Sequence, residues 1–251
     1  MGKIFAVFKR ELGLYFRSPV AYAVAFALLL FFGLWFSNRV DQVSQAQYPA
    51  DFVNNVPSLL TFLMFLVAPL LTMRLLAEET REGTLETLMT LPIRESQFIL
   101  GKFLAVWAYY TVLLAITVVY HIIVTQIGVP DLGRVFGLYL GAWLYGGAVL
   151  AVAMVWSAVT EDQIVAAFLG AATILMLVLV ELAANWIASL PDQGTITWLV
   201  DFVREFSLPA HYDATLAVGV IRAEDILYFV FLMAAALFIT TRIVEVRRWR
   251  S

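Results

Sequence analysis

The stretch that decides the fold of this 251-residue chain runs from Pro57 to Gln126. It begins with an apolar run, Pro57–Met73, which reads PSLLTFLMFLVAPLLTM. A polar segment follows over Arg74–Lys102, RLLAEETREGTLETLMTLPIRESQFILGK, and a second apolar run, Phe103–Gln126, reads FLAVWAYYTVLLAITVVYHIIVTQ. Each apolar run has the roughly 17–25 residues that a helix needs to cross a bilayer. The pattern predicts two membrane spans joined by a charged segment.

The composition of the whole chain is that of an integral membrane protein. It is 62% hydrophobic and 14% charged, whereas soluble domains have about 45–50% apolar and about 25% charged residues. The long runs are continuously apolar and lack the alternation of barrel strands, and backbone groups in lipid must be satisfied within the segment, so we expect helices. The sequence therefore predicts one all-α domain over residues 1–251 with six transmembrane helices: Pro19–Ser37, Pro57–Met73, Phe103–Gln126, Val135–Val159, Ile164–Ser189 and Ile226–Val244.

Lysine and arginine are concentrated on one side of this predicted bundle. Six spans put both termini and the Arg74–Lys102 segment on the same side, and leave only Arg39, Arg134, Arg204 and Arg222 on the other. Because basic loops are retained in the cytoplasm, we expect both termini and Arg74–Lys102 to be cytoplasmic, in a bacterial-type inner membrane. The twelve basic residues of that side are Lys3, Lys9, Arg10, Arg17, Arg74, Arg81, Arg94, Lys102, Arg242, Arg247, Arg248 and Arg250.

The N-terminal segment, residues 1–18, has the pattern of an interfacial helix. Ile4, Phe5 and Phe8 oppose Lys9 and Arg10 along it, which is typical of a helix that lies in the headgroup region before the chain enters the membrane. A simple cytoplasmic extension of the first span is the alternative.

The polar segment Arg74–Lys102 has an apolar stripe in its second half. Gly83 separates two short helical pieces, and after it Leu85, Leu88 and Met89 recur at helical spacing. A narrow stripe of this kind suits a helix that docks in the groove of a partner protein.

Three carboxylates share a face of the same segment. Glu78, Glu82 and Glu86 recur every four residues, which leaves a metal site as an alternative, although no His or Cys accompanies them and Arg81 is close. A helix that touches only lipid is a further alternative, but anionic headgroups disfavour so many carboxylates. We favour the docking helix.

The sequence lacks the residues and motifs that most catalytic mechanisms require. The sequence contains no cysteine and only two histidines, His121 and His211, which we expect to be structural. It has none of the nucleophile or zinc-hydrolase motifs and no phosphate-binding G-x-x-x-x-G-K-[ST]. A net charge of −3 gives no reason to expect a nucleic-acid partner. We therefore expect no enzyme activity, no bound cofactor and no metal in this chain.

The spans and outer loops carry a few features of their own. Glu181 is the one ionisable residue well inside a predicted span, so it is either a pathway or gating residue or a paired structural group. Residues 190–225 form the longer outer loop, in which WLVDFVREF (198–206) predicts a short interfacial helix. Small residues in the fourth span predict close helix packing: Gly137, Gly141, Gly146 and Gly147.

Four stretches together resemble the type-2 ABC transporter permeases, and they cover essentially the whole chain. EETREGTLETLMTLP (78–92) with Gly-Lys at 101–102 resembles the coupling region of that family. RELGLYFRSPVAY (10–22) resembles its elbow helix, and SAVTEDQ (157–163) its loop between spans four and five. HYDATLAVGVIRAEDILYF (211–229) is most similar to the GldF-like branch, named for gliding motility.

The resemblance implies a function and partners. The chain would be the permease subunit of an exporter-type ABC transporter, and a separate ATPase chain would bind ATP and Mg²⁺. A second copy or a homologous permease would meet the first and fifth spans, and any extracytoplasmic machinery would be an auxiliary protein. The ATPase would dock on Glu79, Arg81, Glu82, Gly83, Thr84, Leu85, Glu86, Leu88, Met89 and Leu91, and on Glu161, Asp162 and Gln163.

Other classes of membrane protein stay open at this point. An ion-coupled secondary carrier would normally carry several intramembrane charges and broken helices, and this sequence offers only Glu181. A membrane scaffold is a further alternative. The output of an ATP-driven complex could be substrate efflux or mechanical work on a partner, and nothing in the spans selects a substrate.

Overall fold

The computed structural model describes residues 2–44, 55–83, 93–127, 131–189 and 197–248, and these ranges contain helices and no strand. Six helices are long and apolar enough to cross a membrane, which confirms the predicted all-α membrane fold. In chain order the elements are α1 (Gly2–Tyr15), α2 (Pro19–Ser44), α3 (Val56–Thr72), α4 (Arg74–Arg81), α6 (Glu95–Ile127), α7 (Leu132–Val159), α8 (Gln163–Ala188), α9 (Thr197–Arg204), α10 (Leu208–Asp213), the 3₁₀ helix η2 (Leu216–Val218) and α11 (Ala223–Arg248).

Several helices continue beyond the predicted spans. α6 begins at Glu95 where the sequence predicted a start at Phe103, and α2 continues to Ser44 where it predicted an end at Ser37. Hydropathy identifies the part of a helix that is apolar enough to lie in the bilayer. The helical hydrogen bonds can continue beyond it through polar residues with good helix propensity. The charged segment is therefore shorter than predicted, because its last third belongs to α6.

The central element of the bundle is α7. In its most apolar stretch 78% of the residues are buried, against 17% for α8 and 22% for α2. It packs against α3, α6, α8 and α11. The predicted role of its glycines is confirmed: a Cβ at Gly146 would overlap the ring of Tyr110, and one at Gly141 would lie 2.8 Å from Tyr212. These glycines thus let side chains of α6 and of the later segment around Tyr212 lie directly on α7.

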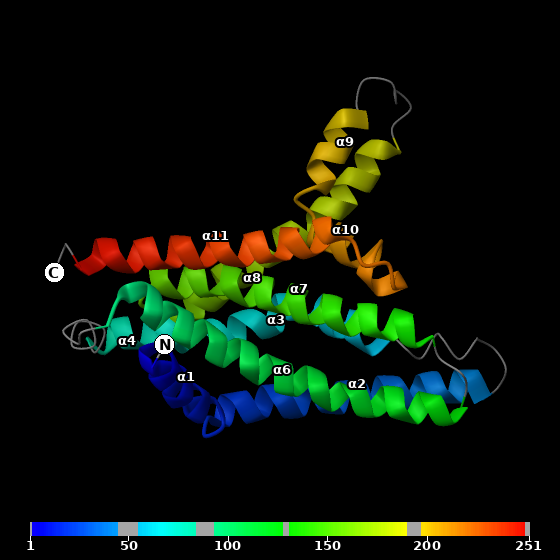
Figure 1. The fold of residues 1–251 in the computed structure, drawn as a ribbon, viewed down its shortest axis with the longest axis horizontal. Coiled ribbons are helices and arrows are strands. Elements are labelled where there is room, and N and C mark those ends of the chain that lie inside the picture. The colour runs from blue at the N-terminus through cyan, green and yellow to red at the C-terminus, as the bar shows by residue number, and fades with distance from the viewer. Residues whose placement is uncertain (1, 45–54, 84–92, 128–130, 190–196, 249–251) are drawn as a thin grey trace.

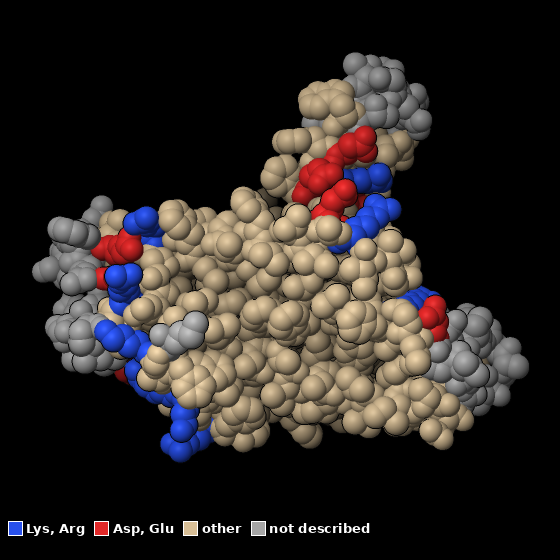
Figure 2. Space-filling view, viewed as in Figure 1, with Lys and Arg blue, Asp and Glu red and all other residues tan. Residues whose placement is uncertain are grey.

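One end of the bundle carries most of the basic side chains. The start of α1, the end of α11 and the short α4 all lie at the left end in Figure 1, and Lys and Arg gather at that end in Figure 2. We call it the basic end. α1 is a separate helix, inclined to α2 and divided from it by Phe16–Ser18. Its place in a membrane interface, and the cytoplasmic location of the basic end, stay predictions.

The opposite end holds the short helices of the predicted outer loop. The far part of α8 and the antiparallel α9 stand away from the bundle in Figure 1, and Trp198 and Phe202 of α9 are exposed. α10 and η2 fold back onto α7. His211 of α10 lies 2.9 Å from Asp225 and stacks on Tyr228, so this histidine has the structural role predicted for it.

The close packing at Gly146 can be tested with a matched pair of glycines. Gly146→Ala pushes a methyl group into the Tyr110 ring and should cost about 1–3 kcal/mol of stability. Gly13→Ala, in α1, meets no atom within 4 Å and should stabilise by up to about 1 kcal/mol through helix propensity. Thermal unfolding in mild detergent measures both. A Gly146 variant as stable as the Gly13 variant would contradict the packing.

Candidate functional site at the basic end

Four charged side chains meet inside the basic end. Lys102 Nζ, at the start of the α6 span, lies 2.8 Å from a carboxylate oxygen of Glu79 in α4 and 3.2 Å from one of Glu11 in α1. The Lys102 side chain is only 2% exposed, and those of Glu11 and Glu79 are 6% and 11% exposed. Arg10 adds a second cation at 3.8 Å from Glu79 and 3.9 Å from Glu11. Two carboxylates therefore face two cations, and we call these four residues the ion cluster.

α1 reaches the ion cluster because one of its faces packs against α6. Val7, Glu11 and Tyr15 recur every four residues on this face and are buried. A Cβ at Gly101 would lie 2.8 Å from Val7 and 3.1 Å from the carbonyl oxygen of Ile4, so a glycine is needed for the close approach. Gly101 brings α1 onto α6, and the next residue, Lys102, compensates the carboxylate that α1 buries.

Tyr15 fastens the end of α1 to two other helices. Its hydroxyl donates a 2.5 Å hydrogen bond to the carbonyl oxygen of Leu71 in α3, and its ring stacks on Tyr109 of α6 at 5.2 Å between centroids. The Arg74 guanidinium lies over the same ring at 5.5 Å. Burial raises the pKa of Tyr15 above its ordinary value, so the hydroxyl stays a donor at physiological pH.

A side chain from α7 holds the junction between α3 and α4. α4 begins directly after Met73, which provides no side-chain cap, so its first N–H groups need another acceptor. Ser157 Oγ accepts from the N–H groups of Leu76 and Ala77 at 3.0 and 3.1 Å, and donates to the carbonyl oxygen of Met73 at 2.9 Å. A displacement of α4 is therefore resisted by the end of α7.

The structure divides the predicted docking residues of the coupling segment into two groups. Glu79 is buried in the ion cluster, whereas Arg81, Glu82 and Gly83 are exposed at the end of α4. Gly83 ends the helix with φ = +67°, a left-handed conformation that favours glycine. The predicted break at Gly83 is thus present on its N-terminal side. The remaining predicted residues lie outside the described ranges: Thr84, Leu85, Glu86, Leu88, Met89 and Leu91.

The second predicted contact, Glu161-Asp162-Gln163, lies at the same end. Glu161 and Asp162 are exposed between α7 and α8. Asp162 caps α8 by accepting from the N–H groups of Ile164 and Val165 at 2.7 and 3.2 Å. Arg247 of α11 donates to the carbonyl oxygen of Val159 at 2.6 Å. This hydrogen bond joins the end of α11 to the end of α7, next to this loop.

Between α1, α4 and α6 the basic end is hollowed by a cleft of about 690 Å³. Side chains of both signs line it, including Arg17, Arg74 and Glu78 together with the ion cluster. A polar cleft beside the buried charges gives water access to the edge of the cluster. The ion cluster thus borders a cleft and is not sealed inside the bundle on every side.

Glu181, the other candidate, lies far from this cluster near the opposite end. It accepts a hydrogen bond from Asn185 at 3.3 Å and lies 3.9 Å from Arg204 of α9. Arg204 in turn donates to Asn185 at 2.8 Å. These contacts join α8 to α9, which agrees with a paired structural group, while a pathway or gating role for Glu181 stays a prediction.

Comparison with known proteins identifies the family. A family described as "ABC-2 family transporter protein" matches residues 35–203, more than half of the chain. This chain belongs to the ABC-2 transporter family. It is also similar to the "Probable ABC transporter permease protein NosY" of Pseudomonas aeruginosa, at 38% identity over 107 residues. That alignment covers 41% of this chain and 38% of the relative, so the chain matches well under half of the length of this curated relative.

Sequence reasoning missed most of the residues that build this ABC-2 site. Lys102 entered as one of the basic residues and as part of the Gly-Lys pair, and Glu11 and Ser157 entered only as members of longer motifs. A signal for Glu11 was available, since it falls four residues from both Val7 and Tyr15 on the apolar face of the N-terminal helix. A carboxylate on a buried face requires a cation from another element, but the sequence does not say which one.

Removing the lysine of the ion cluster should destabilise this ABC-2 protein strongly. Lys102→Met leaves two buried carboxylates without their closest cation. This should lower the free energy of unfolding by about 3–5 kcal/mol. Arg242→Met is the control, because its partner Glu245 at 2.6 Å forms an ion pair on the surface, worth about 1 kcal/mol or less. Denaturation in mild detergent compares the two.

The compensating variant makes this test specific. Adding Glu11→Gln and Glu79→Gln to Lys102→Met should recover part of the lost stability, because the uncompensated charges are removed. Equal losses for Lys102→Met and Arg242→Met, or no recovery in the triple variant, would contradict a structural role of the cluster.

The cap from α7 makes a separate prediction for α4. Ser157→Ala removes the acceptor of two N–H groups and should cost about 1–2 kcal/mol, with faster hydrogen–deuterium exchange in peptides that cover residues 74–81. Ser189→Ala removes an exposed hydroxyl that bonds its own helix at 2.6 Å and should leave that exchange unchanged. Unaltered exchange in the Ser157 variant would show that α4 does not depend on this contact.

Proposed function

We propose that this chain is the permease subunit of an ATP-driven exporter, whose residues 74–102 couple it to a separate ATPase chain that binds ATP and Mg²⁺. The observation that carries the proposal is the ion cluster. It joins the N-terminal helix α1, the helix α4 that leads into residues 84–92, and the start of the α6 span. The sequence has no phosphate-binding loop of its own, so the proposal assigns hydrolysis to the partner.

The proposed coupling uses two surfaces of the basic end. Residues 84–92 would seat in a groove of the ATPase, and the exposed Glu161 would make a second contact. A movement of residues 84–92 would act on α4, which is tied to α1 and α6 through Glu79 and to α7 through Ser157. Such a change requires contacts that differ between the nucleotide states. The exchange of ion-pair partners around Lys102 would supply that difference.

A second permease subunit, identical or homologous, is part of the proposal. α2 and α8 are the least buried spans of the first five, and both pack against α3. α3 itself exposes Phe62 and Leu66. A partner subunit on the side of α2, α3 and α8 would frame a translocation path between two copies, as the family resemblance implies.

The output of the complex is either substrate efflux or force on an associated protein. The exposed α8–α9 end is the surface on which an auxiliary extracytoplasmic protein would act. The stretch 211–229 continues to favour the GldF-like branch within the family. The proposal places the chain in a bacterial-type inner membrane with the basic end in the cytoplasm.

Association with an ATPase is the direct test. We expect a tagged chain, purified in mild detergent from its native source, to bring down a soluble chain with a phosphate-binding loop in stoichiometric amount. Glu86→Lys combined with Leu88→Asp should abolish that association through charge repulsion and loss of the apolar stripe, while membrane insertion is retained. Mass spectrometry of the eluate is the measurement.

The control makes equivalent changes at the opposite end. Asp201→Lys with Phe202→Asp alters an exposed charge and an exposed ring of α9 and should leave ATPase association intact. Unchanged association of the Glu86/Leu88 variant would remove the docking role from residues 84–92. Reproducible purification without any ATPase would favour a carrier or a scaffold.

A further inference from the structure

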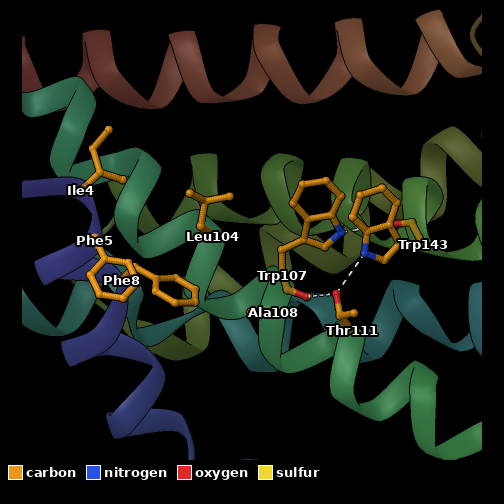
Figure 3. A pocket seen from close by; sticks show the side chains of 8 residues that line it. All are labelled: Ile4, Phe5, Phe8, Leu104, Trp107, Ala108, Thr111 and Trp143. Atoms are coloured by element: carbon orange, nitrogen blue, oxygen red, sulfur yellow. Dashed lines mark hydrogen bonds between the residues drawn. The ribbon is translucent and has the colours of Figure 1, made fainter. Parts of the chain in front are cut away.

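A groove lies between α1 and the flank of the bundle formed by α6 and α7 (Figure 3). Its volume is about 480 Å³, within the range of about 300–1,000 Å³ typical of small-molecule sites. Ile4, Phe5 and Phe8 form one wall. Trp107 and Trp143 form the other, stacked with 4.3 Å between ring centroids. None of its lining residues belongs to the ion cluster.

The polar atoms of this aromatic wall are satisfied by one another. The Thr111 hydroxyl donates to the carbonyl oxygen of Trp107 at 2.7 Å and accepts from Trp143 Nε1 at 2.9 Å (Figure 3). Trp107 Nε1 donates to the carbonyl oxygen of Trp143 at 3.2 Å. Each indole N–H already donates to an acceptor within the protein, so a ligand at this wall needs no polar atom to pair with it. An occupant gains by burying hydrocarbon there.

The helix that forms one wall of the groove also carries a positive charge. α1 carries Lys9, an exposed residue four positions after Phe5 and therefore on the same side of the helix. Within the described ranges no ion pair holds Lys9. An exposed lysine thus lies one helical turn from a wall residue of a hydrocarbon-lined groove, an arrangement that matches a molecule with an anionic head and an apolar chain.

We propose that the groove binds a phospholipid with an anionic headgroup from the leaflet at the basic end. One acyl chain lies between Phe5 and Phe8 on one side and the Trp107–Trp143 pair on the other, and the phosphate lies against Lys9. The lipid fills the wedge between α1 and the bundle, and so supports the helix that carries Glu11 into the ion cluster. Anionic lipid content would thereby set the position of α1.

Lipid titration followed by native mass spectrometry tests the site. The full chain in mild detergent is titrated with palmitoyl-oleoyl phosphatidylglycerol or with the matching phosphatidylcholine. Ala108→Phe fills the groove from its α6 wall. Ala115→Phe makes the same change seven residues further along the same helix, at an exposed position outside the groove. We expect tenfold weaker phosphatidylglycerol binding for Ala108→Phe and unchanged binding for Ala115→Phe.

The lysine makes a prediction about selectivity. Lys9→Gln should reduce the preference for phosphatidylglycerol over phosphatidylcholine by about fivefold, the contribution of one basic residue near the headgroups. It should leave phosphatidylcholine binding as it is. Equal binding of the two lipids by the wild-type chain would overturn the proposal, and so would equal effects of the two phenylalanine variants. Dimers lost in Ala108→Phe with unchanged lipid binding would assign the groove to a second copy instead.

A measurement on the wild-type chain does not depend on the folding of any variant. In nanodiscs of phosphatidylcholine, a small fraction of phosphatidylglycerol with brominated chains should quench tryptophan fluorescence more than the same fraction of brominated phosphatidylcholine. The excess should come from Trp107 and Trp143 among the seven tryptophans, and should shrink in Trp107→Phe. Equal quenching by the two brominated lipids would contradict a selective site.

Discussion

The burial of Lys102 between two carboxylates is the constraint on which the basic end depends. A lysine that is 2% exposed is tolerable only while its partners stay within ion-pair distance, because an uncompensated charge in this setting costs several kcal/mol. The partners come from α1 and α4, so three elements from distant parts of the sequence must keep their positions together. Arg10, half exposed, lies at the edge of the cluster and lines the cleft.

The rest of the bundle combines a tightly packed centre with open flanks. Glycines let Tyr110, Tyr212 and Leu216 lie directly on α7, and Ser157 connects this helix to the α3–α4 junction. Few residues of α2 and α8 are buried. The closely packed and the open parts of this ABC-2 protein thus fall on different helices.

Most of the architecture could be predicted from the sequence, because six long apolar runs leave few alternatives in lipid. The glycines of the fourth span also indicated close packing correctly. The ion cluster could not be predicted, since Glu11, Glu79 and Lys102 come together only through the packing of α1 on α6 and of α4 on α7. The family resemblance implied that Glu79 docks the ATPase, whereas the structure buries most of its side chain in the ion cluster. Some helices extend past the predicted span ends because polar residues continue the helical hydrogen bonds. α6, for example, begins at Glu95.

The packing of α11 on α7 has a consequence for biosynthesis. α11 is the most C-terminal span, yet it packs on the central helix more extensively than any other element does, with Met233 placed against Gly147. Chains emerge from the ribosome N-terminal end first, so α7 must wait in the bilayer with this face uncovered until α11 has been inserted. A nascent chain that stalls before α11 thus exposes the centre of the fold, which membrane quality control can recognise as unfinished.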